Sequence, residues 1–485
     1  MAEFNYDKES LQEEVEEMLP MANPNQKDIF DEVMTAIEDD SPIAKAFFIQ
    51  SAGGCGKTFT LNLLLKSIRL QGKIAIAVAS SGIAGLLLEG GSTAHSWFAI
   101  PIFLEEKSRI KLGSEKATII RDSAIIIWDE APMANKDNFR VVDELLRDIM
   151  KDVDETLESV PFGGKVFIAS GDWRQILPVV RRGTRASIIG SCLKRSYLWN
   201  EFKVLHLTIN MRVHLCGNPS NKTFARWLLD VGDGKNGNHL TIPDSMLVES
   251  GSVDDLVDTV FLSFDKPTLS TSCILSPKNK TIETLNDAIL ERLPAEEDEY
   301  CSADYFAEDQ AEQANTYPPE FLNTLSPAGL TQHRLRLKVG APIMLIRNLN
   351  RADGLMNGTR LIIKKLMKYF VEAEVITGTH KGTTVCLPRL NLTPSDNSQH
   401  AIRFTRRQFP FRLAFCVTIN KSQGQTLDGV GVLLPGPVFS HGQAYVALSR
   451  CGNQNHIHIL LQRGAWPDEN TSNAMKNVVW KEVLV

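Results

Sequence analysis

The segment SAGGCGKT at residues 51–58 constrains the fold more than any other part of the sequence. It follows the apolar run AFFIQ and precedes TFTLNLLLKSIRL, whose apolar spacing predicts a helix that ends before Gly72. Glycines at Gly53, Gly54 and Gly56 tolerate the backbone angles that let successive N–H groups wrap phosphate oxygens. A strand, a glycine-rich turn and a helix in this order predict a phosphate-binding loop.

The first part of the chain alternates between apolar runs and segments with helical spacing. Continuous apolar runs of this length are typical of parallel strands covered on both faces, so the alternation predicts a doubly wound α/β lobe. The expected strands are AFFIQ (46–50), KIAIAVAS (73–80), AIIIWDE (124–130), KVFIASGD (165–172) and FKVLHLTIN (202–210).

A second α/β lobe is expected after residue 214. It combines the strand TSCILSP, the helical segment NKTIETLNDAILERL and the strands FRLAFCVTIN, GVGVLLP and HIHILLQ. Gly-punctuated short strands between them predict a small all-β barrel, and the acidic, proline-containing stretch 294–328 predicts a surface loop or wedge. The expected units are an acidic extension (1–22), a first lobe (23–213), a second lobe (214–337 and 405–485) and the barrel (338–404).

Composition is compatible with this division. A chain of 485 residues is too long for one core, and its 43% hydrophobic and 23% charged residues are ordinary for a globular protein. The net charge of −6 is unfavourable for a polyanionic partner, although basic residues cluster locally. Eight cysteines without CxxC spacing predict reduced thiols, and the acidic start is unlike a secretory signal. We therefore expect an intracellular protein without a membrane span.

Polar residues at the strand ends supply the remaining parts of a nucleotide site. We expect Lys57 to reach the β and γ phosphates of ATP, and the Thr58 hydroxyl and the Asp129 carboxylate to hold Mg²⁺. Glu130 would orient and deprotonate the attacking water. Gln175, after another strand, is expected beside the γ phosphate, with an ordinary surface glutamine as the alternative.

Taken together, the motifs resemble those of superfamily-one DNA helicases of the PIF (petite integration frequency) type, especially the helicase region of Helitron transposons. The matching stretches, which cover nearly the whole chain from about residue 23, are SAGGCGKT, ASSGIAGLLLEGGSTAHSWFAIPI, IIIWDEAPM, GDWRQILPV, LTINMR, LKVGAPIMLIRNLNRADGLMNGTRLI, TINKSQGQTLDGV and HGQAYVALSR. One departure is Ser51, which stands where the first glycine of the phosphate loop is usual.

The resemblance implies two RecA-like lobes with an SH3-like β-barrel insertion, and a wedge insertion at about 97–118. It also implies an enzyme that uses ATP and Mg²⁺ to move five-prime to three-prime on single-stranded DNA and to unwind tailed duplexes. Gln26 resembles the adenine-reading glutamine, and Arg212 and Arg450 resemble arginines that contact the γ phosphate. Gln423 and Gly424 lie in the motif that couples nucleotide to DNA.

A further set of residues matches the family's strand contacts. Asn420 is a departure, because cellular members often have histidine there, and together with Trp97 it favours the transposon-like branch. Trp97 is a candidate platform for base stacking, with a core aromatic as the alternative. The candidate DNA-binding residues are Thr93, His95, Trp97, Thr418, Asn420, Lys421 and Ser422.

Two other functions stay open at this point: a nucleotide-dependent clamp that does not unwind, and an RNA-remodelling ATPase. The intact Lys57, Glu130 and Arg450 favour the motor over the clamp. We expect a monomer that is nuclear if its source is a eukaryote. The start of the chain suggests an isolated helicase domain, and the resemblance leaves open that it belongs to a longer transposase.

Overall fold

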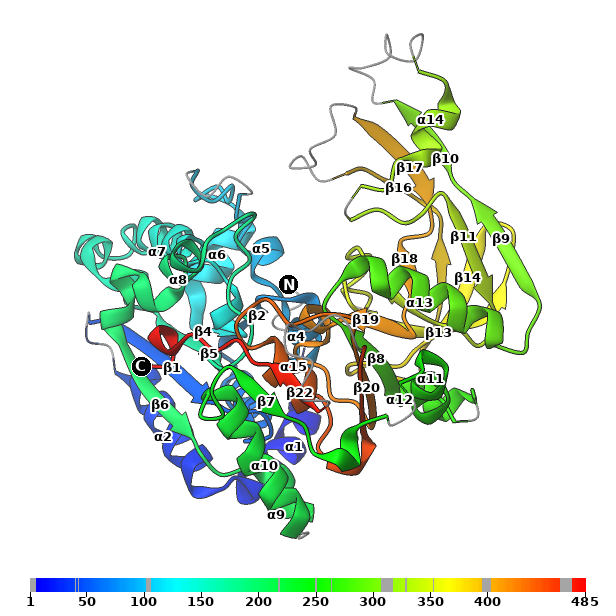
Figure 1. The fold of residues 1–485 in the computed structure, drawn as a ribbon. Coiled ribbons are helices and arrows are strands. Elements are labelled where there is room, and N and C mark those ends of the chain that lie inside the picture. Colours follow the sequence, from blue (N-terminus) through cyan, green and yellow to red (C-terminus); the bar gives the residue numbers. More distant parts are fainter. Residues whose placement is uncertain are drawn as a thin grey trace.

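Two lobes and a β-rich arm make up the computed structural model (Figure 1). The second lobe carries the arm, which projects away from the first lobe. No helix within the described ranges is long and apolar enough to cross a bilayer. The structure describes residues 6–39, 41, 43–101, 106–216, 219–248, 251–262, 264–306, 317–327, 329–351, 353–394, 403–462 and 473–485.

A six-stranded parallel sheet forms the centre of the first lobe, in the order β3-β2-β4-β5-β1-β6. All five strands expected from the apolar runs are confirmed. Alternate side chains enter opposite cores: Trp128 packs on one face, whereas Ile127 packs on the other. The strands are β1 (Lys45–Ser51), β2 (Ile74–Ala79), β3 (Ser92–Thr93), β4 (Ser123–Asp129), β5 (Val166–Gly171) and β6 (Phe202–Leu207).

Helices cover both faces of this sheet, and the predicted helix after the phosphate loop is confirmed as α3 (Lys57–Leu70). The wedge predicted at about 97–118 falls partly on residues 102–105, which lie outside the described residues. The other helices of this lobe are α1 (Lys8–Met21), α2 (Pro24–Glu38), α4 (Gly82–Leu87), α5 (Ala94–Trp97), α6 (Glu115–Asp122), α7 (Lys136–Met150) and α8 (Arg185–Gly190).

The second lobe contains a four-stranded parallel sheet in the order β19-β8-β20-β21. Its strands are β8 (Ser272–Ser276), β19 (Cys416–Thr418), β20 (Gly429–Leu434) and β21 (Ile457–Leu461). The helices beside it are α11 (Val253–Val260), α12 (Lys266–Thr271), α13 (Asn279–Arg292) and α15 (Gln443–Ser449), whereas α9 (Met211–Cys216) and α10 (Pro219–Gly232) connect the first lobe to it, and α10 packs against α15. The single strand expected from FRLAFCVTIN is wrong, because the chain changes sheets at Ala414 and Phe415: β18 (Phe411–Leu413) pairs in the arm, and β19 pairs in the lobe.

The arm holds a five-stranded antiparallel sheet, β15-β14-β13-β12-β18, and two smaller sheets, β10-β17-β16 and β11-β9. Strands that precede residue 338 and follow residue 404 thus pair within it. Its elements are β9 (Glu297–Cys301), β10 (Ala303–Phe306), α14 (Pro319–Thr324), β11 (Arg334–Lys338), β12 (Pro342–Leu345), β13 (Arg360–Leu366), β14 (Phe370–Val375), β15 (Thr384–Pro388), β16 (Leu390–Leu392) and β17 (Phe404–Gln408).

The loop expected at 294–328 is partly wrong, since β9, β10 and α14 lie within it. The acidic residues of β9 are accommodated because they pair with the basic strand β11. Arg336 Nε donates to Glu297 Oε1 at 2.7 Å, and Arg334 lies 3.5 Å from Glu299. A strand whose charges are matched across the ladder does not need an alternating apolar pattern.

The end of the chain returns to the first lobe, whereas the sequence assigned residues 405–485 to the second. The C-terminus lies beside the first-lobe sheet in Figure 1. β22 (Ala474–Lys476) pairs with β7 (His239–Thr241), and Trp480 and Val483 then enter the first-lobe core. An apolar contact of this kind carries no local pattern, because its partners are hundreds of residues away.

Candidate functional site

An open cleft of about 570 Å³ lies between the lobes at the carboxyl ends of β1 and β4. Parallel strands present their carboxyl ends at one edge of a sheet, which is where such folds bind ligands. First-lobe residues that line the cleft include Ser51, Gly53, Gly54, Gly56, Lys57, Thr58, Asp129, Glu130, Gln175 and Arg212. The second lobe contributes Gly424, Gln425, Thr426, Ser449 and Arg450.

The phosphate loop requires glycine at two positions. Gly54 has φ +89°, and a Cβ there would lie 3.0 Å from Asn210 Oδ1. Gly56 has φ +78°, and a Cβ there would clash with the side chain of Gln26. Ser51, the departure from the usual motif, is buried at the end of β1, and its hydroxyl donates to the carbonyl of Ala52 at 3.1 Å. The serine is therefore accommodated without a contact that distorts the glycine-rich turn.

Lys57 and the two carboxylates at the end of β4 form one charged cluster. Lys57 Nζ lies 2.5 Å from Asp129 Oδ1 and 3.0 Å from Glu130 Oε1. Burial opposes the charged ammonium, but the two carboxylates raise the pKa of Lys57 above its usual value. Ser170, at the neighbouring strand end, donates its hydroxyl to Asp129 Oδ1 at 2.7 Å. The structure thus brings together three of the residues expected to bind phosphate, metal and water.

Glu130 is held in an unusual conformation. Its φ of +52° lies in the left-handed region, which is rare for residues other than glycine. Burial raises the pKa of the Glu130 carboxyl, but Lys57 and the hydrogen bond from Gln423 lower it more, so the group is ionised at neutral pH. Gln423 Nε2 donates to Glu130 Oε2 at 3.0 Å, which joins the second lobe to the candidate general base.

Three amide oxygens beside this cluster have no hydrogen-bond partner within the described part of the chain. Gln175, Gln423 and Gln425 are 5%, 2% and 6% exposed, and the side-chain Oε1 of each is buried and unbonded. Gln175 also lines the cleft, so the alternative of a surface glutamine is wrong. Buried polar atoms without partners are costly, which fits a site whose donors arrive with a hydrated metal and a water. Together with the glycine cradle, they make the site fit a magnesium nucleotide.

Both polar atoms of the Gln26 side-chain amide already form hydrogen bonds. It lies in the first turn of α2, where its Oε1 accepts from the N–H of Asn23 at 2.9 Å and completes a capping box. Its Nε2 donates to the carbonyl of Gly56 at 3.5 Å, at the phosphate loop. Contact with an adenine edge would require these bonds to be exchanged.

Arg212 and Arg450 both line the cleft, but their guanidinium groups contact the second lobe. Arg212, from α9, donates through Nη2 to Thr426 Oγ1 at 2.9 Å. Arg450 follows α15 and donates to the Val446 carbonyl at 2.9 Å and the Gln425 carbonyl at 3.2 Å. The bond to the Val446 carbonyl caps the end of α15, and burial lowers the pKa of Arg450.

Gly424 follows Gln423 with φ +81°, and a Cβ at this position would lie 3.7 Å from Ala84 Cβ. The motif that contains both residues thus packs against α4 of the first lobe.

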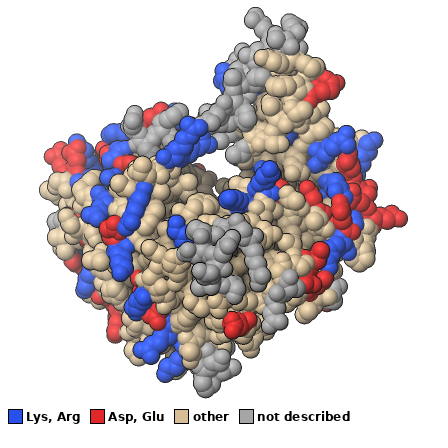
Figure 2. Space-filling view, viewed as in Figure 1, with Lys and Arg blue, Asp and Glu red and all other residues tan. Residues whose placement is uncertain are grey.

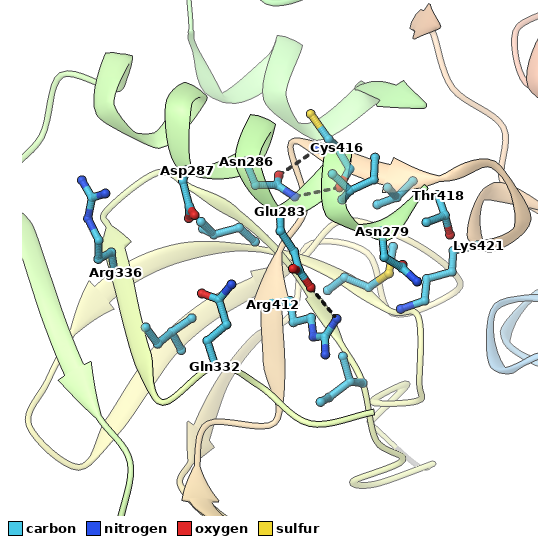
Figure 3. A pocket seen from close by; sticks show the side chains of 16 residues that line it. Asn279, Glu283, Asn286, Asp287, Gln332, Arg336, Arg412, Cys416, Thr418 and Lys421 are labelled. Atoms are coloured by element: carbon cyan, nitrogen blue, oxygen red, sulfur yellow. Dashed lines mark hydrogen bonds and ion pairs between the residues drawn. The ribbon is translucent and has the colours of Figure 1, made fainter. Parts of the chain in front are cut away.

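The candidate strand contacts divide into exposed and buried residues. His95 and Lys421 are exposed, and Thr93 and Thr418 are partly exposed. Lys421 and Thr418 border a pocket between α13 and the arm, which Arg412 and Glu283 also line (Figure 3). Asn420 Oδ1 accepts from Gln443 Nε2 at 3.1 Å.

Two of the candidate strand contacts need correction. The Trp97 ring is 7% exposed and packs edge-on against Phe98 in the first-lobe core, with ring centroids 4.9 Å apart, so it is a core aromatic rather than a stacking platform. Ser422 is fully buried, and its hydroxyl donates to the Ile419 carbonyl at 2.8 Å. Neither side chain has a surface that a strand could contact.

Sequence reasoning missed two buried residues beside the cleft, Asp172 and Tyr445. The Tyr445 hydroxyl donates to Asp172 Oδ2 at 2.8 Å and accepts from the N–H of Gly53 at 3.2 Å. The position of Asp172 directly after a buried strand is a signal that could have identified it. Tyr445 lies within a run of apolar residues and carries no comparable signal.

Two family models match the chain: PIF1-like helicase over residues 21–241, and the 2B domain of DNA helicase Pif1 over residues 320–366. The ATP-dependent DNA helicase PIF1 of Danio rerio is 26% identical over 457 residues, which cover 91% of this chain and 62% of the relative. The Pif1 helicase of Campylobacter jejuni is 26% identical over 429 residues, which cover 85% of this chain and 88% of the relative. The chain spans about three fifths of the length of the vertebrate relatives.

Solved structures share the fold. The Pif1 helicase of Candida albicans has a TM-score of 0.63 and 24% identity, with 90% of this chain and 94% of that chain covered. A Bacteroides Pif1 bound to single-stranded DNA has a TM-score of 0.64 and 22% identity, with coverages of 94% and 98%. These likenesses confirm the predicted α/β fold with two RecA-like lobes.

Proposed function

Because the chain belongs to the PIF1-like helicase family, we propose that it is an ATP-hydrolysing DNA helicase that moves five-prime to three-prime on single-stranded DNA and unwinds duplex. One observation carries this proposal. In the interlobe cleft Lys57, Asp129 and Glu130 of the first lobe meet Gln423 of the second. A site built from two lobes can convert nucleotide chemistry into movement of one lobe against the other.

Lys57 and the backbone N–H groups of the phosphate loop bind the phosphates. In the present conformation the Lys57 ammonium is paired with both Asp129 and Glu130. Phosphate oxygens compete for the same ammonium, so binding frees both carboxylates for their own roles. The Thr58 hydroxyl and the Asp129 carboxylate would hold Mg²⁺, which supplies positive charge to the phosphate oxygens when bound.

Glu130 takes the proton of the attacking water. Its carboxylate is ionised at neutral pH, and its left-handed backbone points the side chain into the cleft. Gln423 orients the carboxylate through Oε2. When the proton moves to Glu130, the carboxyl group becomes neutral. It then does not compete with the phosphates for the Lys57 ammonium.

Arg212 and Arg450 support charge development as the lobes approach. Each guanidinium lies on the cleft wall and is held by second-lobe oxygens. In phosphoryl transfer, arginines at this position stabilise charge on the equatorial oxygens. Lobe closure then completes the site, and lobe opening releases products.

The strand is proposed to cross the two lobes beside the arm. Thr93 and His95 would contact its phosphates from the first lobe, and Thr418, Asn420 and Lys421 from the second. Figure 2 shows Lys and Arg side chains on both sides of the opening between the first lobe and the arm, which suits a polyanion despite the net charge of −6. Hydroxyl and ammonium groups grip phosphates without reading sequence.

The decisive experiment measures ATP turnover and strand displacement on duplexes that carry either a five-prime or a three-prime single-stranded tail. We expect DNA-stimulated turnover, and displacement only with the five-prime tail. Stimulated turnover without displacement on either substrate would instead favour the clamp, and stimulation by RNA alone would favour an RNA-remodelling ATPase. A Lys57→Ala variant should remove activity in every arm and controls for contaminating ATPases.

Finer features belong to the same proposal. We infer that the protein acts as a monomer, because the cleft is complete within one chain, and this is checked by light scattering with and without a tailed duplex. Asn420 and the sequence around Trp97 support a Helitron-like origin and hence a place within a transposase. Nuclear localisation in a eukaryote would follow from action on chromosomal DNA.

A further inference from the structure

Tyr445 of α15 hydrogen-bonds the phosphate loop from the opposite lobe. Its phenol oxygen accepts from the backbone N–H of Gly53, with 3.2 Å between N and O. Its hydroxyl donates to Asp172 Oδ2 at 2.8 Å, and Asp172 directly follows β5. One second-lobe side chain thus joins two first-lobe segments that border the cleft.

The surroundings of Tyr445 leave its ring little freedom. Tyr445 is 2% exposed and Asp172 is fully buried. A Cβ at Gly232, where α10 ends, would lie only 2.9 Å from Tyr445 Cδ2, so glycine allows the helix to approach the ring. Asp172 Oδ1 also accepts from the N–H of Arg174 at 3.1 Å, and Arg174 Nε donates to Asp233 Oδ1 at 2.6 Å. The Tyr445 side chain is therefore held by three segments besides its own helix: the phosphate loop, the residue that follows β5 and the end of α10.

This position matters because phosphate-loop N–H groups are the donors that hold phosphates. The Gly53 N–H, which is one of these donors, donates here to the Tyr445 oxygen of the opposite lobe. Ser449, one helical turn after Tyr445, faces the same peptide, since a Cβ at Gly53 would lie 3.8 Å from the Tyr445 oxygen and 3.9 Å from Ser449 Cβ. Arg450 is the next residue, and its Nη2 donates to Ser449 Oγ at 2.9 Å. One short helix thus links the Gly53 peptide to Arg450 through contacts of Tyr445 and Ser449.

We propose that Tyr445 is a positioning residue that couples the state of the phosphate loop to the placement of Arg450. The inference rests on the proposed ATPase function and adds a residue to it. The Tyr445 hydroxyl fixes the spacing between the Gly53 peptide, Asp172 and α15 when the lobes are together. Without it the nucleotide still binds to the loop, but Arg450 is no longer held at a fixed distance from the transferring phosphate.

The test is Tyr445→Phe, which removes only the hydroxyl. We expect kcat for DNA-stimulated ATP turnover to fall about tenfold and KM for ATP to change less than twofold, because an interaction used in the transition state is lost. Affinity for ADP should stay within twofold, whereas affinity for ADP with aluminium fluoride, which mimics the transferring phosphate, should fall about tenfold. If the hydroxyl had a purely structural role, its removal would not lower kcat selectively while KM stays constant. It also would not change the ratio of the affinities for ADP and for ADP with aluminium fluoride.

Tyr197→Phe is the matched control, because the Tyr197 hydroxyl also donates to an aspartate, Asp143 Oδ2, at 2.8 Å, away from the cleft. Its turnover should stay within twofold of wild type. Asp172→Asn is the second variant should Tyr445→Phe fold poorly, and the same split is expected. Turnover is expressed per folded molecule from the unfolding curve of each preparation. If the wild type turns over ATP and both Tyr445→Phe and Asp172→Asn have the same kcat as the wild type, the coupling is overturned. If the wild type itself does not turn over ATP, the proposed function is overturned.

Discussion

The nucleotide cleft differs from the surface proposed to contact the strand, the strand-facing surface, which is formed by Thr93, His95, Thr418, Asn420 and Lys421. Both are marked by short motifs, but their residues are held in different ways. In the cleft Lys57 contacts two carboxylates, and Glu130 is bonded from both lobes. On the strand-facing surface Lys421 is exposed, whereas Ser422, its neighbour in the same motif, is buried. Buried charges need partners, so motif residues of the cleft converge. A phosphate contact needs only an exposed donor, so a motif does not determine which of its residues faces the strand.

The largest effect is expected at Arg450, where the cleft depends on the second lobe. Arg450→Ala should lower DNA-stimulated turnover by roughly 10³-fold, because an arginine at the transferring phosphate contributes about 10³ to 10⁵ in rate. DNA affinity, measured by fluorescence anisotropy, should stay within a few-fold of wild type.

Arg450→Lys separates charge from hydrogen bonding. The lysine keeps the positive charge but cannot reproduce the fork that binds the Val446 and Gln425 carbonyls. It should recover turnover only in part. If Arg450→Ala retained turnover within a few-fold of wild type, its guanidinium would be a helix cap alone and would have no part in the transfer of the phosphate.

Glu130→Gln tests the first-lobe side of the same cleft. We expect ATP to bind with little loss while turnover falls roughly 10²-fold or more, because the base is removed and the shape of the side chain is kept. Glu144→Gln on α7 is the control, since Glu144 is also paired with a cation, Arg140, at 2.8 Å but lies outside the cleft. Equal turnover in the two variants would contradict the assignment of Glu130.

These differences explain how much could be predicted from the sequence. Most strands of the two parallel sheets carry their own apolar runs, although the two-residue β3 does not and the run FRLAFCVTIN is divided between two sheets. The phosphate loop combines glycines with Lys57 in eight residues, so local patterns suffice for the loop and for most of both sheets. The return of Trp480 to the first-lobe core depends on partners far along the chain, as does the bond between Tyr445 and Gly53. The orientation of Trp97 and Ser422 depends on packing that no short pattern records.

His441 tests the contact between the lobes beside the cleft. It is fully buried, accepts from the Trp480 N–H at Nδ1, and bonds the Trp173 carbonyl through Nε2 at 2.8 Å. Burial lowers its pKa from 6.5 to about 4. Between these values the unfolded chain binds the proton and the folded chain does not, so stability falls as pH falls from 6.5 toward 4.

The free energy of unfolding should fall by about 3 kcal/mol as the pH falls from 6.5 toward 4, since one pKa unit corresponds to about 1.4 kcal/mol. Urea unfolding from pH 7 to pH 4.5 measures it. His441→Gln should lower stability at pH 7 yet flatten the dependence of stability on pH below pH 6.5. A slope that persists in His441→Gln would assign the acid sensitivity to other groups.

The smallest effect separates two neighbours on the strand-facing surface. Lys421→Ala should weaken binding of a single-stranded oligonucleotide by a few-fold and reduce the salt dependence of log K by about 0.7, because one phosphate contact is lost. Ser422→Ala should leave affinity and salt slope unchanged, since its hydroxyl is fully buried and bonded to the Ile419 carbonyl. Scrambled oligonucleotides should give the same result, because phosphate contacts carry no sequence information. If Ser422→Ala lost more DNA affinity than Lys421→Ala, the motif would have to open when DNA binds. Burial in the cleft and exposure on the strand-facing surface would then not be fixed properties of the two regions.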